Sequence, residues 1–294
     1  MTESWQEISL SDIFKAQKRI KEFLDPTPST KSCFLDEFAV EVTLKEENLS
    51  TTGSWFDRAV LNALLVLSEE QRRRGVITVS ENKPFIRALY HFGPKLGIPV
   101  ILMVPVESEI QEELLSRPGR VIVSCGFDIE ETRRYAEELA KGIGLEVINS
   151  DLSYPMLAGL CTLGLEIADQ CGSNIDAILV PYMDRSILKA LKCSLKFVLP
   201  RVQIIGVNLD TKEKTRVSRS SDKEDSLEDA VLCIREPSAF QAVIRVIEEY
   251  SVKKEKGTCT EMVDVVSPSL AQLRYKRVVV VVSSDCLVHS PHHL

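Results

Sequence analysis

The chain has 294 residues, of which 44% are hydrophobic and 27% charged, and its formal net charge is −7 at pH 7. This length predicts one large or two medium domains, and the composition excludes a disordered, collagen-like or membrane-spanning chain. The acidic balance argues against nucleic acid or an anionic membrane as a main partner.

Eight short apolar runs rich in β-branched residues are predicted strands, and seven stretches of helical period are predicted helices. The strands are expected, in chain order, at residues 40–44, 76–79, 100–104, 120–124, 145–148, 177–180, 203–207 and 277–282. The helices are expected at 55–74, 85–96, 109–116, 129–141, 156–170, 185–197 and 239–250. Because the strands read as continuous apolar runs, we expect an α/β fold with parallel strands covered by helices on both faces.

Loops that follow the carboxyl ends of parallel strands are the usual ligand-binding positions in such folds. The candidate functional loops are therefore residues 50–58, 80–85, 124–128, 181–186 and 283–287. The segment 211–229 is rich in serine, threonine and charged residues and is expected to be an exposed loop.

The cysteines and histidines suggest no metal or disulfide framework. The eight cysteines include no C-x-x-C pair, which is typical of reduced thiols in a cytoplasmic protein, and the N-terminus has no signal-peptide pattern. His289, His292 and His293 lie near the C-terminus without a fixed set of partner ligands, so no metal site is predicted.

Three stretches around the first candidate loop carry a family resemblance. Residues 42–49 read VTLKEENL, residues 52–58 read TGSWFDR, and residues 62–77 end in SEEQRRRGVI. Their order resembles the fold-type II pyridoxal-phosphate enzymes, specifically the serine/threonine dehydratase (ammonia-lyase) and serine racemase family. The resemblance implies two domains of doubly wound sheets, as in the tryptophan synthase β-subunit. It places a large domain at residues 1–76 and 152–294, and a small α/β domain at residues 77–151 inserted in it.

In that family, the lysine of a T-G-S-F-K segment forms the Schiff base with the cofactor and moves the substrate's α-proton. The resemblance places Phe56 at the lysine position, after Thr52, Gly53, Ser54 and Trp55. Only an amine can form the imine and then act as the base, so a phenyl ring supports neither step. We therefore expect Phe56 to be a buried aromatic side chain and the chain to have no catalytic residue.

Two more family loops are altered here. The loop around the pyridine ring aligns with Ser80, Asn82 and Lys83, and Lys83 takes the position of the ring-binding asparagine. The four glycines that bind the cofactor phosphate align with four residues that carry side chains: Met183, Asp184, Arg185 and Ser186. Side chains keep the backbone amides away from a phosphate, and the carboxylate at position 184 would repel it.

The glycine content fits these changes. The chain has 13 glycines, about 4% against a usual share of roughly 7%. The family would place glycine at positions 82, 183–186 and 284–285, where this chain has none. Ser283, after the last strand, is the one cofactor contact kept by residue type. We therefore expect no bound cofactor, although the family cofactor is pyridoxal 5'-phosphate.

The predicted function is that of a non-catalytic relative of the L-serine/L-threonine ammonia-lyases and serine racemase. One alternative is a rebuilt dehydratase-type lyase that acts on amino acids through Lys83, Glu81 or Cys125. Another is an amino-acid or small-anion sensor that binds at residues 52–54, at the start of a helix. Because family members are commonly dimers, we expect the chain to pair with itself or with an active relative, without nucleic acid or membrane.

Overall fold

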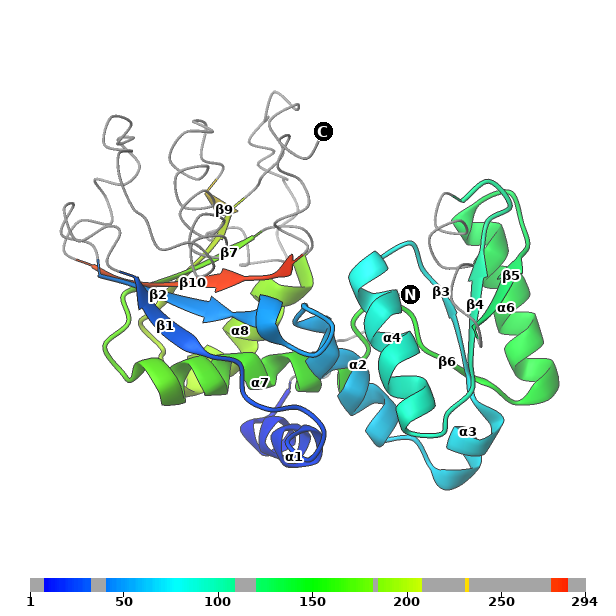
Figure 1. The fold of residues 1–294 in the computed structure, drawn as a ribbon, viewed down its shortest axis with the longest axis horizontal. Coiled ribbons are helices and arrows are strands. Elements are labelled where there is room, and N and C mark those ends of the chain that lie inside the picture. Colours follow the sequence, from blue (N-terminus) through cyan, green and yellow to red (C-terminus); the bar gives the residue numbers. More distant parts are fainter. Residues whose placement is uncertain are drawn as a thin grey trace, which may run out of the picture. The chain divides into compact units, whose positions relative to one another are not determined.

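The computed structural model describes residues 8–32, 41–108, 120–181, 185–207, 231–232 and 276–284, which Figure 1 shows in colour. The chain forms two compact units, one from Met1–Pro26 and Ser50–Thr162 and the other from Thr27–Leu49 and Leu163–Leu294. We call them the small-sheet unit and the large-sheet unit, because they contain a four-stranded and a six-stranded sheet. The chain crosses between the units after Pro26, Leu49 and Thr162.

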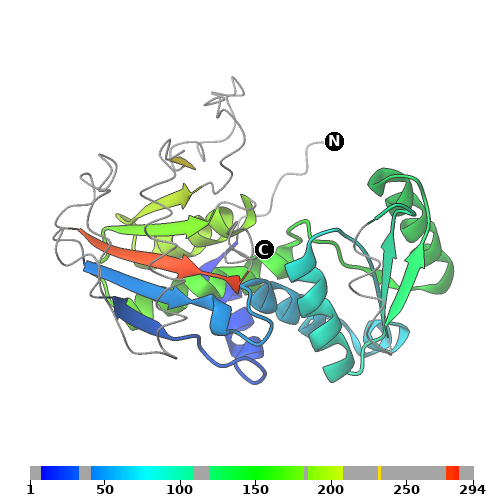
Figure 2. The same cartoon turned by 45° about the horizontal axis from the view of Figure 1, so that its top comes forward.

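The large-sheet unit is built on strands in the order β1-β2-β10-β7-β8-β9. Only the β1–β2 pair is antiparallel among the strand pairs of the described residues. Figures 1 and 2 both show β10, in red, beside β2, so a segment near the C-terminus lies in the middle of the sheet. The strands are β1 (Ser29–Ser32), β2 (Glu41–Glu46), β7 (Ala177–Pro181), β8 (Gln203–Val207), β9 (Val231–Leu232) and β10 (Arg277–Val282).

Three helical elements belong to the large-sheet unit in whole or in part. The 3-10 helix η2 (Glu47–Leu49) follows β2, and α8 (Arg185–Val198) lies beside the C-terminal part of α7 (Tyr154–Cys171). Gly164 lets α7 and α8 approach closely, because any β-carbon there would collide with the hydroxyl of Ser194. Figure 1 shows both helices on one face of the sheet.

The small-sheet unit contains four parallel strands in the order β5-β4-β3-β6. They are β3 (Val76–Val79), β4 (Val100–Val104), β5 (Val121–Ser124) and β6 (Glu146–Val147). Its helices are α1 (Leu10–Ile20), α2 (Phe56–Leu65), α3 (Glu69–Arg74), α4 (Lys83–Lys95) and α6 (Ile129–Ile143). Helix α6 packs on β3 and β4 through a core that includes Ile77, Met103 and Ala136.

The helix ends of the small-sheet unit follow from local chemistry. Asp128 caps α6 by accepting the amide of Glu131, and Gly144, at φ 75°, ends that helix. Ser68 and Gln71 form a reciprocal capping box that starts α3. The single helix predicted at residues 55–74 is therefore wrong, because this capping box begins a second helix.

The predicted α/β class is confirmed, and each of the eight predicted strands overlaps an observed one. The sequence reasoning missed α1, β1 and β9. The predicted helices at 109–116 and 239–250 and the predicted loop at 211–229 lie outside the described residues. The predicted domain boundary at 76/77 falls inside β3, after its first residue, and the one at 151/152 follows β6, whereas the compact units also place α1, α2 and α3 with the four-stranded sheet. As a statement about domains, those boundaries remain a prediction.

Candidate functional site

The loop between η2 and α2 is closed by the carboxylate of Asp57. This fully buried carboxylate accepts the Thr52 amide at 2.7 Å and the Thr52 hydroxyl, and it lies 2.9 Å from the Ser50 hydroxyl. The Ser54 amide donates to Ser50 Oγ at 3.0 Å, and Ser54 Oγ accepts the amide of Phe56 at 3.3 Å. All these donors are thus used inside the loop, those of Thr52 by the internal anion Asp57 and the amides of Ser54 and Phe56 by hydroxyl oxygens.

Phe56 is the first residue of α2 and is 2% exposed. Its ring packs edge-to-face against Phe85 in the first turn of α4, with 6.1 Å between ring centroids and 71° between ring planes. Phe85 is fully buried, and such aromatic pairs add stability beyond the area that they bury. Position 56 is therefore an apolar packing position that joins the candidate loops before α2 and before α4.

The loop that follows β3 also uses its polar groups locally. Ser80 Oγ accepts the amide of Asn82 at 3.1 Å and lies 3.1 Å from the hydroxyl of Ser150. Asn82 Oδ1 accepts the amide of Phe85 at 3.1 Å and so caps α4. The side chain of Lys83 is exposed to solvent. The structure therefore explains Ser80 and Asn82 as turn and cap residues.

The remaining predicted cofactor positions lie in the large-sheet unit. Met183 and Asp184 lie outside the described residues, and Arg185 is the first residue of α8. Ser186 is half-buried in the first turn of that helix. Ser283 directly follows β10 and is fully buried, at the carboxyl end of a parallel strand as the sequence predicted. A role for these residues toward a phosphate or a ring remains a prediction.

The residues proposed for a rebuilt site are spread around the small sheet. Glu81 is exposed and lies 3.3 Å from the Ser108 hydroxyl, whereas Cys125 packs against the core under α6. His91, on α4, has no hydrogen-bond partner for Nε2 in the part of the chain that the structure describes. Burial lowers the pKa of His91, the charge of Lys95 lowers it further, and Asp57 opposes both effects. The described residues contain no cluster of metal-ligating side chains.

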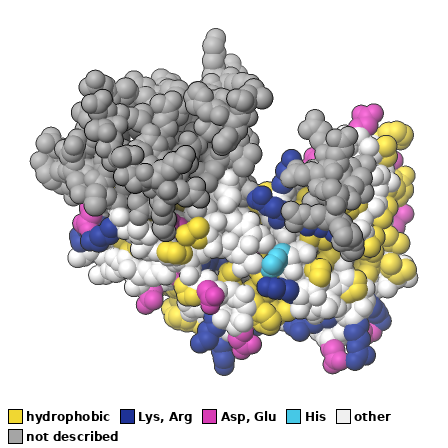
Figure 3. Space-filling view, in the orientation of Figure 1, with side chains coloured by type: hydrophobic (Ala, Val, Ile, Leu, Met, Phe, Trp, Pro, Cys, Tyr) yellow, Lys and Arg dark blue, Asp and Glu magenta, His cyan; other side chains and the backbone are white. Residues whose placement is uncertain are grey.

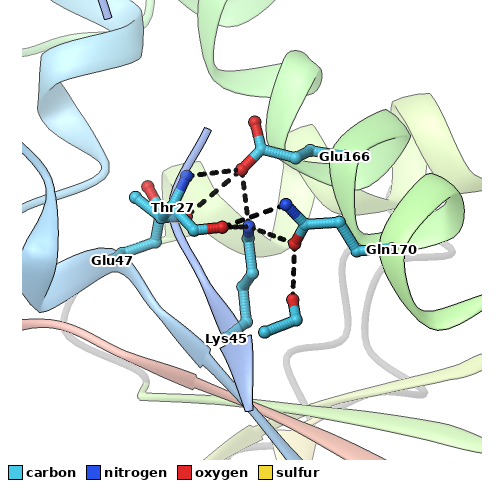
Figure 4. Close-up of polar contacts among 6 residues, drawn as sticks. Thr27, Lys45, Glu47, Glu166 and Gln170 are labelled. Atoms are coloured by element: carbon cyan, nitrogen blue, oxygen red, sulfur yellow. Dashed lines mark hydrogen bonds and ion pairs between the residues drawn. The ribbon is translucent and has the colours of Figure 1, made fainter. Parts of the chain in front are cut away.

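The sequence did not lead to one cluster of polar side chains, which Figure 4 shows. We call it the Lys45 cluster, and it consists of Thr27, Ser29, Lys45, Glu47, Glu166 and Gln170. Lys45 Nζ donates to Glu166 Oε1 at 2.5 Å, to the Thr27 carbonyl at 2.6 Å and to Gln170 Oε1 at 2.8 Å. Lys45 and Glu47 are both fully buried. The available signal was the run of three charged residues, Lys45, Glu46 and Glu47, that directly follows the predicted strand at residues 40–44.

The surface of the small-sheet unit carries apolar side chains along β5 and α6. Figure 3 shows hydrophobic side chains gathered on that side of the unit. The exposed residues include Phe127 at 87%, Ile143 at 56% and Val121 at 51%. Among the described residues, no helix combines the length and the apolar character that crossing a bilayer requires.

Comparison with known proteins places these features in a family. Residues 20–267 match the family described as "Pyridoxal-phosphate dependent enzyme". The catabolic L-threonine dehydratase TdcB of Staphylococcus aureus strain N315 is 32% identical over 206 residues, which cover 69% of this chain and 59% of the relative. The matched part of the chain thus spans less than two thirds of that relative's length.

Solved structures of low sequence identity share the fold. The serine racemase of Dictyostelium discoideum is 21% identical and superposes with a TM-score of 0.72, covering 95% of this chain and 98% of that structure. The processed threonine deaminase isoform 2 of Solanum lycopersicum is 18% identical with a TM-score of 0.67, covering 95% and 85%. The predicted fold-type II architecture is therefore confirmed.

These matches overturn the expectation that no cofactor belongs to this chain. The matched family is described by its dependence on pyridoxal phosphate, so this cofactor is the one to be expected. The expectation of no cofactor rested on the residue types at the aligned loop positions alone, and two of these, Met183 and Asp184, lie outside the described residues. The described residues do not fit a covalently held cofactor at position 56, because Phe56 has no amine and its ring is buried against Phe85.

Proposed function

Because the chain belongs to the pyridoxal-phosphate dependent enzyme family, we propose that it is a non-catalytic member related to the L-serine/L-threonine ammonia-lyases and serine racemase. The observation that carries the proposal is the burial of Phe56 against Phe85, at the position that the resemblance assigns to the Schiff-base lysine. A phenyl ring can neither condense with an aldehyde nor accept a proton. The proposal concerns this covalent and proton-transfer chemistry, not whether the cofactor binds by other contacts.

The surroundings of position 56 support a packing role. Asp57 and Arg58, the next two residues of α2, are buried as well, and Asp57 ties the preceding loop to the helix through Thr52. The first turn of α2 is therefore packed on several sides, and the apolar contact with Phe85 leaves no solvent in which an amine could be hydrated. A substrate's α-proton has no acceptor at Phe56.

A rebuilt lyase is the main competitor, with the exposed Lys83 as its amine. The second competing proposal is a sensor of amino acids or small anions. The Thr52 amide and hydroxyl that such a sensor would use already donate to Asp57. Binding there would have to displace the buried carboxylate of Asp57 from these donors. These contacts favour the non-catalytic proposal over the sensor.

The purified full chain tests the proposal directly. It is incubated with pyridoxal phosphate and treated with borohydride, adducts are mapped by mass spectrometry, and ammonia release from serine and threonine is measured. We expect no ammonia release and no borohydride-stable adduct on a residue required for activity. Ammonia release that disappears in a Lys83→Met variant, together with an adduct on Lys83, would show a rebuilt lyase instead.

Two further measurements address the other roles. A rise in melting temperature with serine, threonine or a small carboxylate would support the sensor, because a ligand that binds the folded state stabilises it. We also propose that the chain pairs with itself or with an active relative, which its mass in solution, alone and mixed with an active threonine dehydratase, would test.

A further inference from the structure

The three crossings between the two units have a common neighbour. The chain enters or leaves the large-sheet unit at Thr27, Leu49 and Leu163. Thr27 is a member of the Lys45 cluster, Glu47 lies two residues before the second crossing, and Glu166 lies three residues after Leu163. All six members of the cluster belong to the large-sheet unit. Each crossing therefore lies beside this one polar cluster, of which Thr27, Lys45 and Glu47 are buried.

Thr27 connects the three crossings through hydrogen bonds. Its amide donates to Glu166 Oε1 at 3.0 Å, and its hydroxyl lies 2.5 Å from Glu47 Oε1 and 3.2 Å from Glu166 Oε1. Its carbonyl accepts Lys45 Nζ at 2.6 Å and Gln170 Nε2 at 3.0 Å. One residue at the first crossing thus contacts a residue at the second and a residue at the third, as Figure 4 shows.

The backbone around Thr27 is held in place as well. Thr27 stands between Pro26 and Pro28, whose rings restrict the backbone on both sides. The carbonyl of Pro28 accepts the amide of Glu46 at 3.0 Å, which ties this segment to β2. The first crossing is therefore a stiff segment that is fixed to the neighbouring strand.

Burial makes the cluster cooperative. Thr27 is 2% exposed and Lys45 and Glu47 are fully buried, so water cannot replace a partner lost by these three residues, whereas the Glu166 side chain is 12% exposed and Gln170 is exposed. A buried charge or polar group that loses one partner costs far more than an exposed one. Pulling one crossing segment away removes hydrogen-bond partners from the other two, so the opening of the three segments is coupled.

We propose that the Lys45 cluster is a clasp that holds the three crossing segments at one fixed point of the large-sheet unit. Bending of the chain between the units is then confined to the first two crossings, next to residues 26 and 50, because α7 (Tyr154–Cys171) runs through the third crossing as one continuous helix. The clasp is a conformational device, and it does not depend on the proposed loss of catalysis.

Two isosteric variants of the full chain test the clasp. Thr27→Val removes the hydroxyl that contacts both glutamates and keeps the side-chain shape. Thr30→Val is the matched control, because it removes a hydroxyl of β1 that lies 2.9 Å from Glu46 Oε2 and takes no part in the Lys45 cluster. Backbone hydrogen exchange is followed by mass spectrometry in peptides that cover the three crossings and in peptides that cover β7 and β8.

We expect Thr27→Val to speed exchange about five- to tenfold in all three crossing peptides together, without a change in β7 or β8. Thr30→Val should leave the crossing peptides as they are. Faster exchange at one crossing alone, an equal rise in β7 and β8, the same result in both variants, or no change would overturn the clasp. Gln170→Leu, which removes a second contact of Lys45, repeats the test should Thr27→Val fold poorly.

Discussion

Positions 45 and 56 are both buried, but the two regions meet the cost of burial in opposite ways. Lys45 carries a charge into the large-sheet unit and is surrounded by three oxygen atoms within 2.8 Å. Phe56 brings only carbon into the small-sheet unit and packs its ring on Phe85. A buried amine needs fixed acceptors around it, and a buried ring needs only contact. The described interior is thus built for an ammonium group at position 45 and for a ring at position 56.

The largest expected effect comes from emptying the charged position. Lys45→Met should lower the free energy of unfolding by about 3–5 kcal/mol, because it leaves the Glu166 carboxylate without its buried cation. Urea denaturation measures this change. The matched control is Lys31→Met, which breaks the ion pair with Glu41 between side chains that are 78% and 50% exposed. Lys31→Met should lower the free energy of unfolding by only about 0–1 kcal/mol. Equal losses in the two variants would contradict the idea that the buried ion pair matters more than the exposed one.

Placing an amine at position 56 should lower the free energy of unfolding somewhat less than removing the amine at position 45. Phe56→Lys places an amine beside Phe85 without prepared acceptors, so we expect a loss of about 2–4 kcal/mol and no release of ammonia from serine or threonine. Phe56→Leu keeps the site apolar and should cost less than about 1.5 kcal/mol. A Phe56→Lys variant that is as stable as the parent and releases ammonia with pyridoxal phosphate would show that position 56 still accepts an amine.

An exposed polar contact, the N-cap of α3, should contribute less to the free energy of unfolding than the buried contacts of Lys45. Ser68→Ala removes the capping box of α3, in which Ser68 Oγ accepts the Gln71 amide at 3.2 Å. The expected loss in unfolding free energy is about 1 kcal/mol, because water partly replaces an exposed cap. Ser11→Ala, at an exposed position of α1, serves as the control and should change stability by less than about 0.5 kcal/mol. If Ser68→Ala lowered the free energy of unfolding as much as Lys45→Met, burial would not determine the stability lost when a polar contact is removed.

The smallest effect is a pH dependence at the surface. The pKa of Asp12 is lowered to about 2 by hydrogen bonds from Ser9, Tyr154 and Lys15. Because the folded-state pKa lies below the unfolded one, near 3.8, this stabilisation is complete above that value and is lost as the pH falls toward 2. Denaturation at pH 5 and pH 3 should show a smaller difference in Asp12→Asn than in the parent. Tyr154→Phe, which removes one donor, should lie between them, and identical differences in all three proteins would contradict this role of Asp12.

Local patterns were sufficient for the strands and for several helix ends. Continuous apolar runs marked the buried strands β3, β4, β7 and β10 within one or two residues. The signal was strong because strands covered by helices on both faces have no polar alternation. The break between α2 and α3 was readable from Ser68 and Gln71, but the helical period on either side hid it.

The candidate site was less accessible from the sequence. The order of the loops led to the family and to position 56, and the structure places the loops before α2 and α4 side by side through Phe56 and Phe85. The role of Asp57 as the internal anion of its loop was not readable, because a carboxylate in a first helical turn is more often an exposed residue. The expectation about the cofactor failed because it used residue types without the geometry of the whole loop.

The sequence by itself determined the α/β class, the positions of eight of the observed strands and the family, because periodicity and motif order are local properties of the chain. Only the tertiary structure decided that β10 lies between β2 and β7, and that Thr27, Lys45 and Glu166 meet. These residues are separated by as many as 139 positions, and no local preference links them. The sign of a buried charge's contribution depends on such distant partners, so Lys45 could be understood only once its acceptors were in place.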